Sequence, residues 1–324
     1  MKRHLLLTAI LLICTSFCIA DVFTHKKSGK NFYGYIVNSP GTERTLVRTS
    51  ATSTRRIDLN DFEVEYSFKG RRNRIYVFRI NNSLHLTAEA EAFEEGIFTA
   101  ANQGPFFIVI ELDTPGGNIE LAKKYISAVK EITNCKTIAF VRGDKSGGAF
   151  SSGAIIAMAC DKLYMKKGTS IGAAAAYADT SEGPMDLKKR YGDVYGEKVN
   201  SAWISYCISI AEINNRPSEI VKAMVDKNVE VIEVSKNNKK QFINLVDIKD
   251  SKKYIKTWSK KDSLLTLSAE EAVYCNIADG IIKSYKELKG QFSAERARLI
   301  TDRKIAQAGK KYERINTRLQ ETLT

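Results

Sequence analysis

From residue 75 onward, apolar runs alternate with amphipathic stretches along the chain. The run "PFFIVIEL" is continuously apolar, which is typical of a strand buried on both faces of a sheet. The stretch "NIELAKKYISAVKEIT" places apolar residues at spacings of three and four, which predicts an amphipathic helix. Another strand, "KTIAFVRG", precedes a short glycine-led helix, "GAFSSGAIIAMAC". This alternation predicts an α/β fold in which helices pack around a mostly parallel sheet.

The residues on either side of this region follow different patterns. Residues 21–72 contain short β-prone runs separated by turn-like breaks, and we expect a small all-β module there. We expect the α/β domain over residues 74–285 and a basic, helix-prone tail over residues 286–324. An apolar stripe on this tail is formed by Ala308, Tyr312, Ile315 and Leu319. The stripe is narrow, so the tail is expected either to dock on a partner chain or to remain a solvated arm.

Residues 1–20 have the composition of an export signal. A positive "MKRH" precedes the apolar run "LLLTAILLICTSF", and Ala20 offers a small residue at a cleavage site. The alternative is an uncleaved membrane anchor, because residues 5–20 are nearly long enough to span a thin bilayer. We therefore expect an exported protein that is periplasmic or membrane-associated.

A polar stretch follows Ala178. It reads "DTSEGPMDLKKRYGDVYGEK", with three glycines, one proline and no clear periodicity. Because it is long for a connection inside a compact domain, we expect a lid or a disordered segment. Helical patterning resumes with "VNSAWISYCISIAEINN", and a lysine-rich, hairpin-like segment comes later. Ser268, with Glu271 three residues on, forms a capping box that predicts the start of another helix.

Charge narrows the choice of partners. The 324 residues carry a net charge of +13, spread over the chain rather than gathered in one tract. A basic balance favours anionic surfaces, and we expect a solvated or membrane-facing basic surface. No zinc pattern, aromatic RNA platform or helix-turn-helix signature is present, so we expect no nucleic-acid partner.

The cysteines do not suggest a metal site. None of the four that follow the export signal forms a CxxC pair or a cluster with histidine, so we expect no metal and no cofactor. Export permits disulfides, but the sequence favours small buried hydrophobic side chains. These residues are Cys135, Cys160, Cys207 and Cys275.

A glycine turn ends the buried strand. The sequence "ELDTPGGN" places Gly116 and Gly117 where ligands bind in open parallel sheets, at the carboxyl end of a strand. Glycines permit unusual dihedral angles and leave no side chain in the way, so their amides can face a developing negative charge. An oxyanion hole and a purely structural turn are both compatible with this turn alone.

A serine-rich turn lies 30 residues further on, at "GDKSGGAFSSGAIIAM". A serine at the start of a helix gains from the helix dipole, and the following amide can join an oxyanion hole. The order Ser-x-Gly-Ala followed by apolar residues favours Ser151 as the nucleophile. Ser146 comes too early, and Ser152 is one helical step away. The alternative is that Ser151 is only a helix cap.

No histidine follows Ser151 in the sequence to act as its general base. The chain has three histidines, His4, His25 and His85, and all precede Ser151. This disfavours a Ser-His-Asp triad, although the spacing alone does not eliminate His85. A lysine base must be neutral, and therefore desolvated or close to positive charge. Lys198 is the candidate, because it opens an apolar helix in which Val199 and Trp203 would exclude water.

Four segments in order resemble one family. "IVIELDTPGGNIELA", "GGAFSSGAIIAMACDKLYMKKGTSIGAA", "GEKVNSAWISYCISIA" and "LTLSAEEAVYCNIADGII" are similar to the NfeD-type membrane-bound serine proteases. These are relatives of signal peptide peptidase A and of the proteolytic subunit of Clp protease. The similarity covers roughly residues 74–285 and implies a ClpP/crotonase-like repeated β-β-α core.

The resemblance also implies roles for individual residues. Ser151 is the implied nucleophile and Lys198 the implied general base, with oxyanion donors on Gly116, Gly117 and Ser152. The pattern departs from the family in several ways. After Lys198, Asn200 departs from the residue pattern that is usual in the family. Beside Ser151, Phe150 and Ser152 occupy positions where small apolar residues are common in the family. Transmembrane helices and a small β domain usually follow the protease domain in the family, whereas in this sequence we expect a β module before the domain and a basic tail after it.

We therefore expect an exported serine endopeptidase with a Ser-Lys dyad. The resemblance implies hydrophobic segments of membrane or envelope proteins as substrates, and a homo-oligomer. Two alternatives remain. One is a non-catalytic envelope scaffold on the same fold. The other is an acyl-thioester enzyme of the crotonase type, which the export signal and the lack of a fitting carboxylate base both disfavour.

Overall fold

The computed structural model describes most of the chain after the expected export signal. The described residues are 20–36, 45–50, 52–65, 72–180, 183–236, 239–248 and 253–323. Apart from Ala20, the predicted export signal lies outside them. Within these ranges, no helix combines the length and the apolar character that crossing a bilayer requires.

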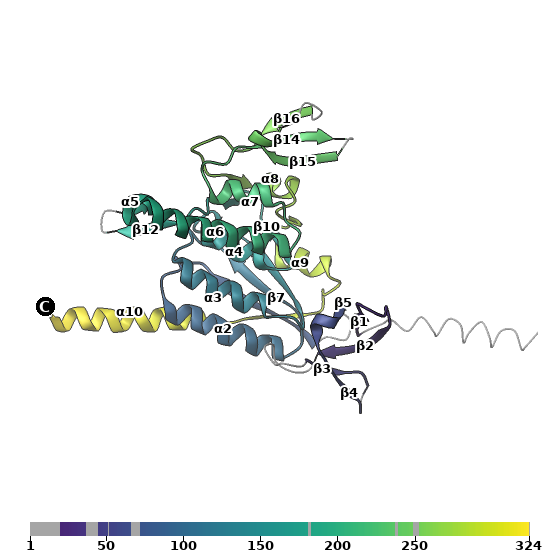
Figure 1. Ribbon diagram of the computed structural model, residues 1–324. Helices are drawn as coiled ribbons and strands as arrows, with labels where there is room; N and C mark the ends of the chain where they lie inside the picture. The colour runs from purple at the N-terminus through teal and green to yellow at the C-terminus, as the bar shows by residue number, and fades with distance from the viewer. Residues whose placement is uncertain are drawn as a thin grey trace, which may run out of the picture.

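A six-stranded sheet forms the centre of the molecule, and each strand runs parallel to its neighbours (Figure 1). The order across the sheet is β18-β10-β8-β7-β6-β19. The strands are β6 (Arg72–Ile80), β7 (Pro105–Leu112), β8 (Lys136–Val141), β10 (Lys162–Met165), β18 (Gly280–Ile281) and β19 (Arg298–Thr301). The predicted α/β class with a mostly parallel sheet is confirmed.

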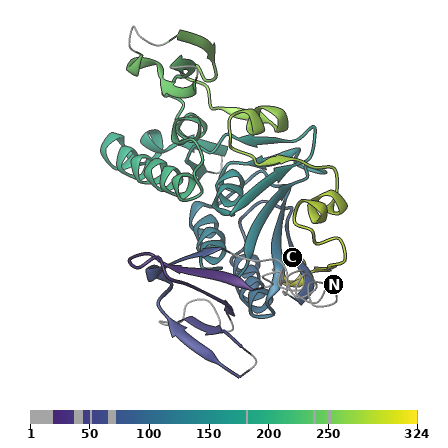
Figure 2. The same cartoon turned by 90° about the vertical axis from the view of Figure 1, so that its right-hand side faces the viewer.

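Both faces of this sheet are buried, which explains the continuous apolar runs. In β7, Ile108 and Ile110 join a core cluster on one face, while Phe107 and Val109 join a separate cluster on the other. The first face is covered by α2 (Thr87–Asn102), α3 (Ile119–Lys130) and α4 (Ser152–Ala159). Figure 2 shows α9 (Tyr285–Gln291) on the opposite side of the sheet.

A smaller sheet lies beside the carboxyl ends of the central strands. It pairs β9 (Gly148–Phe150) in parallel with β11 (Ser170–Gly172), and β11 antiparallel with β17 (Thr266–Ser268). The predicted capping box is present. Ser268 Oγ accepts from the Glu271 amide, and Glu271 accepts from the Ser268 amide, at the start of α8 (Ala269–Tyr274). This sheet holds the segment that leads into α4.

The amino-terminal module is an antiparallel sheet with strand order β4-β3-β2-β1-β5, as its β-prone runs predict. It has its own small core of Phe23, Ile36, Val47 and Ile57. Its elements are β1 (Asp21–His25), β2 (Asn31–Ile36), β3 (Thr45–Arg48), β4 (Thr54–Ile57), η1 (Leu59–Asp61) and β5 (Phe62–Glu65).

The polar stretch expected as a lid or disordered segment has regular structure over its described residues. It forms the hairpin β12 (Tyr177–Thr180) and β13 (Gly183–Asp186), then α5 (Leu187–Tyr191). Helix α6 (Asp193–Ile213) packs against α5, because Gly196 leaves room for the Leu187 carbonyl. The expectation that Lys198 opens this helix is therefore wrong, since α6 begins at Asp193.

The segment between α6 and the small sheet forms a separate layer. Helix α7 (Ser218–Val225) leads to a three-stranded antiparallel sheet, in which β14 pairs with both β15 and β16. The lysine-rich segment expected to be hairpin-like supplies β15 and the start of β16, which both pair with β14 rather than with each other. The elements are β14 (Val231–Lys236), β15 (Lys239–Asn244), η2 (Leu245–Asp247) and β16 (Lys253–Thr257).

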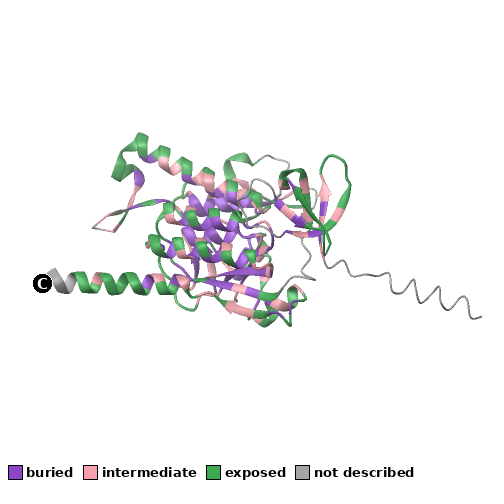
Figure 3. Ribbon diagram, turned by 90° about the horizontal axis from the view of Figure 1, so that it is seen from below, coloured by how far each residue is buried: buried purple, intermediate pink, exposed green. Residues whose placement is uncertain are grey.

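The tail expected to be helical is helical only in part. Strand β19 adds to the edge of the central sheet through β6, and α10 (Lys304–Leu323) follows it. Ile305 and Gly309 are buried where α10 packs on α2. The rest of α10 projects from the body, mostly exposed in Figure 3. Tyr312, Ile315 and Leu319 are exposed there.

Candidate active site

Ser151 lies on a strained turn between β9 and α4. Its dihedral angles are φ +52° and ψ −132°, which are rare for a residue with a side chain and cost about 1–3 kcal/mol. The Ser151 amide donates to the Gly172 carbonyl at 2.9 Å, and the Ser151 carbonyl accepts from the Ala154 amide at 3.0 Å. These bonds hold the backbone in place. A serine on a sharp strand-to-helix turn is the arrangement in which hydrolases expose a nucleophile.

The neighbouring serines are engaged elsewhere. Ser152 Oγ donates to the Gly117 carbonyl at 3.3 Å, and Ser146 Oγ donates to the Asp113 carbonyl at 3.3 Å. The Ser151 side chain makes no capping bond to α4. Among the described residues it has no hydrogen-bond partner, so the geometry favours Ser151 over the other two serines as the reactive hydroxyl.

The glycine turn lies directly against this serine. A Cβ added to Gly116 would be 2.5 Å from Ser151 Cβ and 3.0 Å from Ser151 Oγ. One added to Gly117 would be 2.5 Å from the Leu84 carbonyl oxygen. Both glycines have positive φ, +94° and +149°. The two sequence motifs therefore meet, and the absence of side chains is what allows it.

The three predicted oxyanion donors are not equivalent. The Gly116 amide donates to Thr114 Oγ1 at 3.1 Å, so it is already used inside the turn. In the part of the chain that the structure describes, the amides of Gly117 and Ser152 donate to no protein acceptor. The Ser152 amide also belongs to the first turn of α4, where the helix dipole favours negative charge. The amides of Gly117 and Ser152 are therefore the two that are available to stabilise an oxyanion. Gly116, which has no side chain, leaves the space that Ser151 occupies.

Asp113 ties the glycine turn to the loop before β9. This carboxylate is 5% exposed, and its Oδ1 accepts from the Ser146 amide at 2.7 Å. Its Oδ2 accepts from the Lys145 amide. The pair of bonds fixes the loop that leads into Ser151. No role was predicted for Asp113 from the sequence, although it stands directly before the Thr-Pro-Gly-Gly turn.

Arg216 supports the other end of α4 and was also missed. It is 6% exposed, and its guanidinium donates to the carbonyls of Met158 at 3.4 Å and Cys160 at 3.2 Å. A cation at a helix carboxyl terminus offsets the negative end of the dipole. The only signal in the sequence was an arginine in "NNRPSE", which gives no hint of burial.

Lys198 makes no hydrogen bond to Ser151 in the part of the chain that the structure describes. It is exposed on α6, on a different side of the helix from Trp203, which lies five residues on and so about 140° round the axis. Within the described ranges, Lys198 makes no hydrogen bond or ion pair. The expectation that Val199 and Trp203 shield it from water is therefore wrong. Trp203 instead faces inward, where its Nε1 donates to the Ala174 carbonyl at 2.8 Å.

Helix α6 is nevertheless linked to the nucleophile turn. Gly172 accepts from the Ser151 amide, and Ala174, two residues on, accepts from Trp203. The segment from Gly172 to Ala174 thus touches both elements. A movement of this segment or of α6 would change the separation of Ser151 and Lys198.

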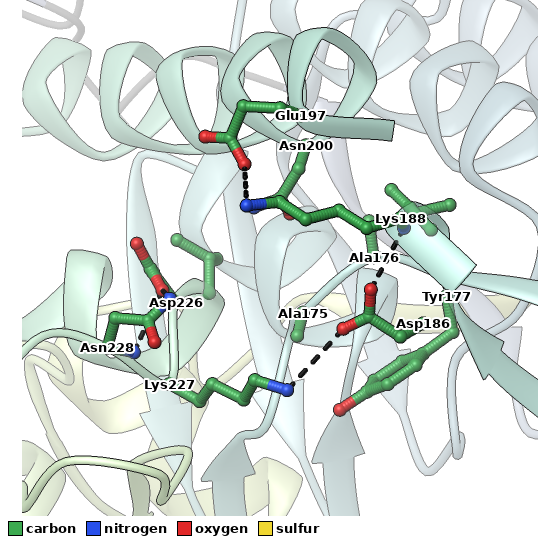
Figure 4. Close-up of a pocket in the computed structure, with 12 residues that line it drawn as sticks. Ala175, Ala176, Tyr177, Asp186, Lys188, Glu197, Asn200, Asp226, Lys227 and Asn228 are labelled. Atoms are coloured by element: carbon green, nitrogen blue, oxygen red, sulfur yellow. Dashed lines mark hydrogen bonds and ion pairs between the residues drawn. The ribbon is translucent and has the colours of Figure 1, made fainter. Parts of the chain in front are cut away.

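A polar cavity of about 270 Å³ lies next to this segment (Figure 4). Ala175, α5, the start of α6 and the residues after α7 line it. Lys188 Nζ is 2.6 Å from Glu197 Oε2, and Lys227 Nζ is 3.4 Å from Asp186 Oδ2. The hydrogen bond that Lys188 donates to Glu197 raises the pKa of Lys188. Both lysines that line this cavity are thus paired with carboxylates, and the raised pKa makes Lys188 unsuited as a base.

Two solved structures of one protease share this fold. Both are of the 1510-N membrane-bound stomatin-specific protease of Pyrococcus horikoshii. A serine-to-alanine mutant matches with a TM-score of 0.51 at 18% identity, over 71% of this chain and 97% of that chain. A lysine-to-alanine mutant in complex with a substrate peptide matches with a TM-score of 0.50 at 18% identity, over 71% and 91%. The chain therefore shares the α/β fold of this protease.

The chain belongs to the NfeD1b family, because the profile of the NfeD1b N-terminal domain matches residues 74–253. It is 23% identical over 236 residues to the membrane protein NfeD1b of Bacillus subtilis (strain 168), covering 73% of this chain and 45% of that protein. It is 25% identical over 158 residues to the membrane-bound protease PH1510 of Pyrococcus horikoshii, covering 49% and 34%. The chain thus spans less than half the length of either relative.

Proposed function

We propose that this protein is a serine endopeptidase in which Ser151 is the nucleophile and Lys198 the general base. The observation that carries the proposal is the strained turn at Ser151, whose hydroxyl lies against a glycine turn with two available amides. Strained backbone conformations of this kind, which cost about 1–3 kcal/mol, cluster at active sites. The names of the relatives support a protease, and the two solved mutants replace a serine and a lysine.

The reaction would proceed through an acyl-enzyme. Lys198 takes the proton from Ser151 Oγ as that oxygen attacks the scissile carbonyl. The amides of Gly117 and Ser152 stabilise the oxyanion. The C–N bond breaks as Lys198 returns the proton to the leaving amine. Water, deprotonated by the same lysine, then attacks the ester, and the carboxylic acid product leaves with Ser151 restored.

The base assignment requires a change of arrangement, because Lys198 is exposed. Its support is the resemblance of the segment around it and the pairing of Lys188 and Lys227 with carboxylates. We propose that assembly into a homo-oligomer, or substrate binding, brings Lys198 to Ser151 and removes it from water. Loss of water lowers the pKa of a lysine, which a base requires.

We propose hydrophobic segments of membrane or envelope proteins as substrates and a location in the periplasm or at the membrane. This follows from the sequence resemblance and from relatives described as membrane or membrane-bound proteins. The solved complex of 1510-N with a substrate peptide supports a peptide ligand.

Active-site labelling tests the proposal. The wild type should react with a fluorophosphonate probe and cleave apolar peptides, and Ser151→Ala and Lys198→Ala should do neither. Ser152→Ala is the control for the neighbouring hydroxyl and Lys188→Ala for a nearby lysine, and both should keep labelling. Labelling that survives in Ser151→Ala refutes the nucleophile. An unreactive wild type supports the scaffold alternative, and a Lys198→Ala variant with full activity removes the dyad.

A further inference from the structure

The side chain of Thr114 lies between the glycine turn and the nucleophile helix. It is fully buried, and its hydroxyl makes two hydrogen bonds. Oγ1 donates to the Asn82 carbonyl at 2.6 Å and accepts from the Gly116 amide at 3.1 Å. The second bond links a threonine side chain to the backbone two residues on, which fixes the turn locally.

The remaining groups of Thr114 contact the elements around Ser151. Its amide donates to the Gly148 carbonyl at 2.9 Å, and its carbonyl accepts from the Phe150 amide at 3.0 Å. Its methyl group lies against the start of α4, where a Cβ on Gly153 would be 2.5 Å from Thr114 Cγ2. One residue therefore joins the glycine turn to both sides of the serine.

The hydroxyl also holds the peptide unit that comes directly before the free amide. Thr114 Oγ1 fixes the amide of the Pro115–Gly116 peptide, and the Leu84 amide fixes the next peptide by donating to the Gly116 carbonyl at 2.8 Å. The Gly117 amide belongs to this second peptide and has no protein acceptor among the described residues. Rigid donors stabilise an oxyanion because they need no reorganisation during the reaction. A shift of about 1 Å in such a donor can cost about 100-fold in rate.

We propose that Thr114 is a positioning residue of the oxyanion hole: its hydroxyl anchors the Pro115–Gly116 peptide, and so the start of the peptide that carries the Gly117 amide, beside Ser151. The proposal rests on the proposed function. Thr114 does not touch the substrate, and acts through the turn. Its loss should therefore weaken stabilisation of the transition state more than binding of the substrate.

The experiment compares Thr114→Val, Thr114→Ser and Thr137→Val. Thr137 is a matched control because its hydroxyl is also buried and makes two bonds to Asp161, at 3.0 and 3.1 Å, at the amino-terminal end of β8. With each protein held equally far below its own melting temperature, Thr114→Val should lose about 10- to 100-fold in kcat and fluorophosphonate reaction rate, with KM little changed. Thr114→Ser should restore most of the rate, and Thr137→Val should keep it.

A second measurement follows the bond itself. Hydrogen exchange at the Gly116 amide should accelerate about tenfold in Thr114→Val and stay near wild type in Thr114→Ser and Thr137→Val. Equal rate losses in Thr114→Val and Thr137→Val, or unchanged exchange at Gly116, overturn the inference. A wild type that neither labels nor cleaves overturns the proposed function and this inference with it. A reactive wild type with a fully active Thr114→Val overturns the inference alone.

Discussion

Replacing Gly116 with alanine tests whether the glycine turn and Ser151 form one site. The added Cβ would lie 2.5 Å from Ser151 Cβ and 2.8 Å from the Phe150 carbonyl oxygen. Neither atom is the end of a flexible side chain, so neither can rotate away. Since carbon atoms prefer separations of about 3.5–4.0 Å, the turn and the serine must move apart by about 1 Å.

Two costs follow from this geometry. Alanine at φ +94° costs about 1–2 kcal/mol, because the left-handed region is unfavourable for residues with a Cβ. Overpacking adds about 1–3 kcal/mol. A displacement of about 1 Å at the reacting atoms should also lower activity by about 100-fold. Gly116→Ala should therefore lose both stability and activity.

Gly168→Ala is the matched control. Gly168 has a similar φ of +83°, but a Cβ added there would meet no atom within 4 Å. It should lose only about 1–2 kcal/mol and keep full activity. Urea unfolding gives the stabilities, and fluorophosphonate labelling with peptide cleavage gives the activities. A Gly116→Ala variant that reacts at the wild-type rate, or is no less stable than Gly168→Ala, refutes the reasoning.

Three further predictions concern stability and access. Arg216→Met should lower the free energy of unfolding, measured by urea denaturation, by about 3 kcal/mol. Arg216→Lys should be destabilised as well, because the lysine ammonium lacks the forked guanidinium that reaches several carbonyls. A loss of less than about 1 kcal/mol in Arg216→Met counts against this prediction. Burial raises the pKa of Glu89 in the folded protein, so the stability that protonated Glu89 contributes is largest below the pKa of the unfolded state and is lost as the pH rises through the pKa of the folded state. The melting temperature of Glu89→Gln should therefore vary less than that of the wild type between about pH 4 and 8. A pH profile of the variant that overlays the wild-type profile contradicts this prediction. Burial raises the pKa of the Cys275 thiol to about 12, so maleimide should modify this thiol only when the protein unfolds. Mass spectrometry follows the modification. Rapid labelling of Cys275 in the native protein would contradict the prediction.

Local patterns were sufficient for much of the fold. The continuous apolar runs predicted buried parallel strands, and spacings of three and four predicted α3, which the structure forms over Ile119–Lys130. The capping box at Ser268 followed in the same way. These features depend on periodicity or on neighbours three or four residues away, which a sequence displays directly.

Other features depend on segments that are far apart. Strand β19 pairs with β6 more than 200 residues earlier, and no local pattern in the tail distinguishes an edge strand from a linker. The stretch after Ala178 is polar and aperiodic, yet it forms a hairpin and α5, because α6 packs closely on α5 through Gly196. Propensity alone cannot supply such packing.

The candidate site shows the same division. The order of residues was enough to identify a serine turn and a glycine turn and to establish that no histidine follows the serine. The packing of distant segments brings Gly116 against Ser151, lets Thr114 occupy the Gly116 amide, and leaves Lys198 exposed. Spacing along the chain specifies which groups are present. Their separations, their bonds and their access to water depend on how distant segments pack.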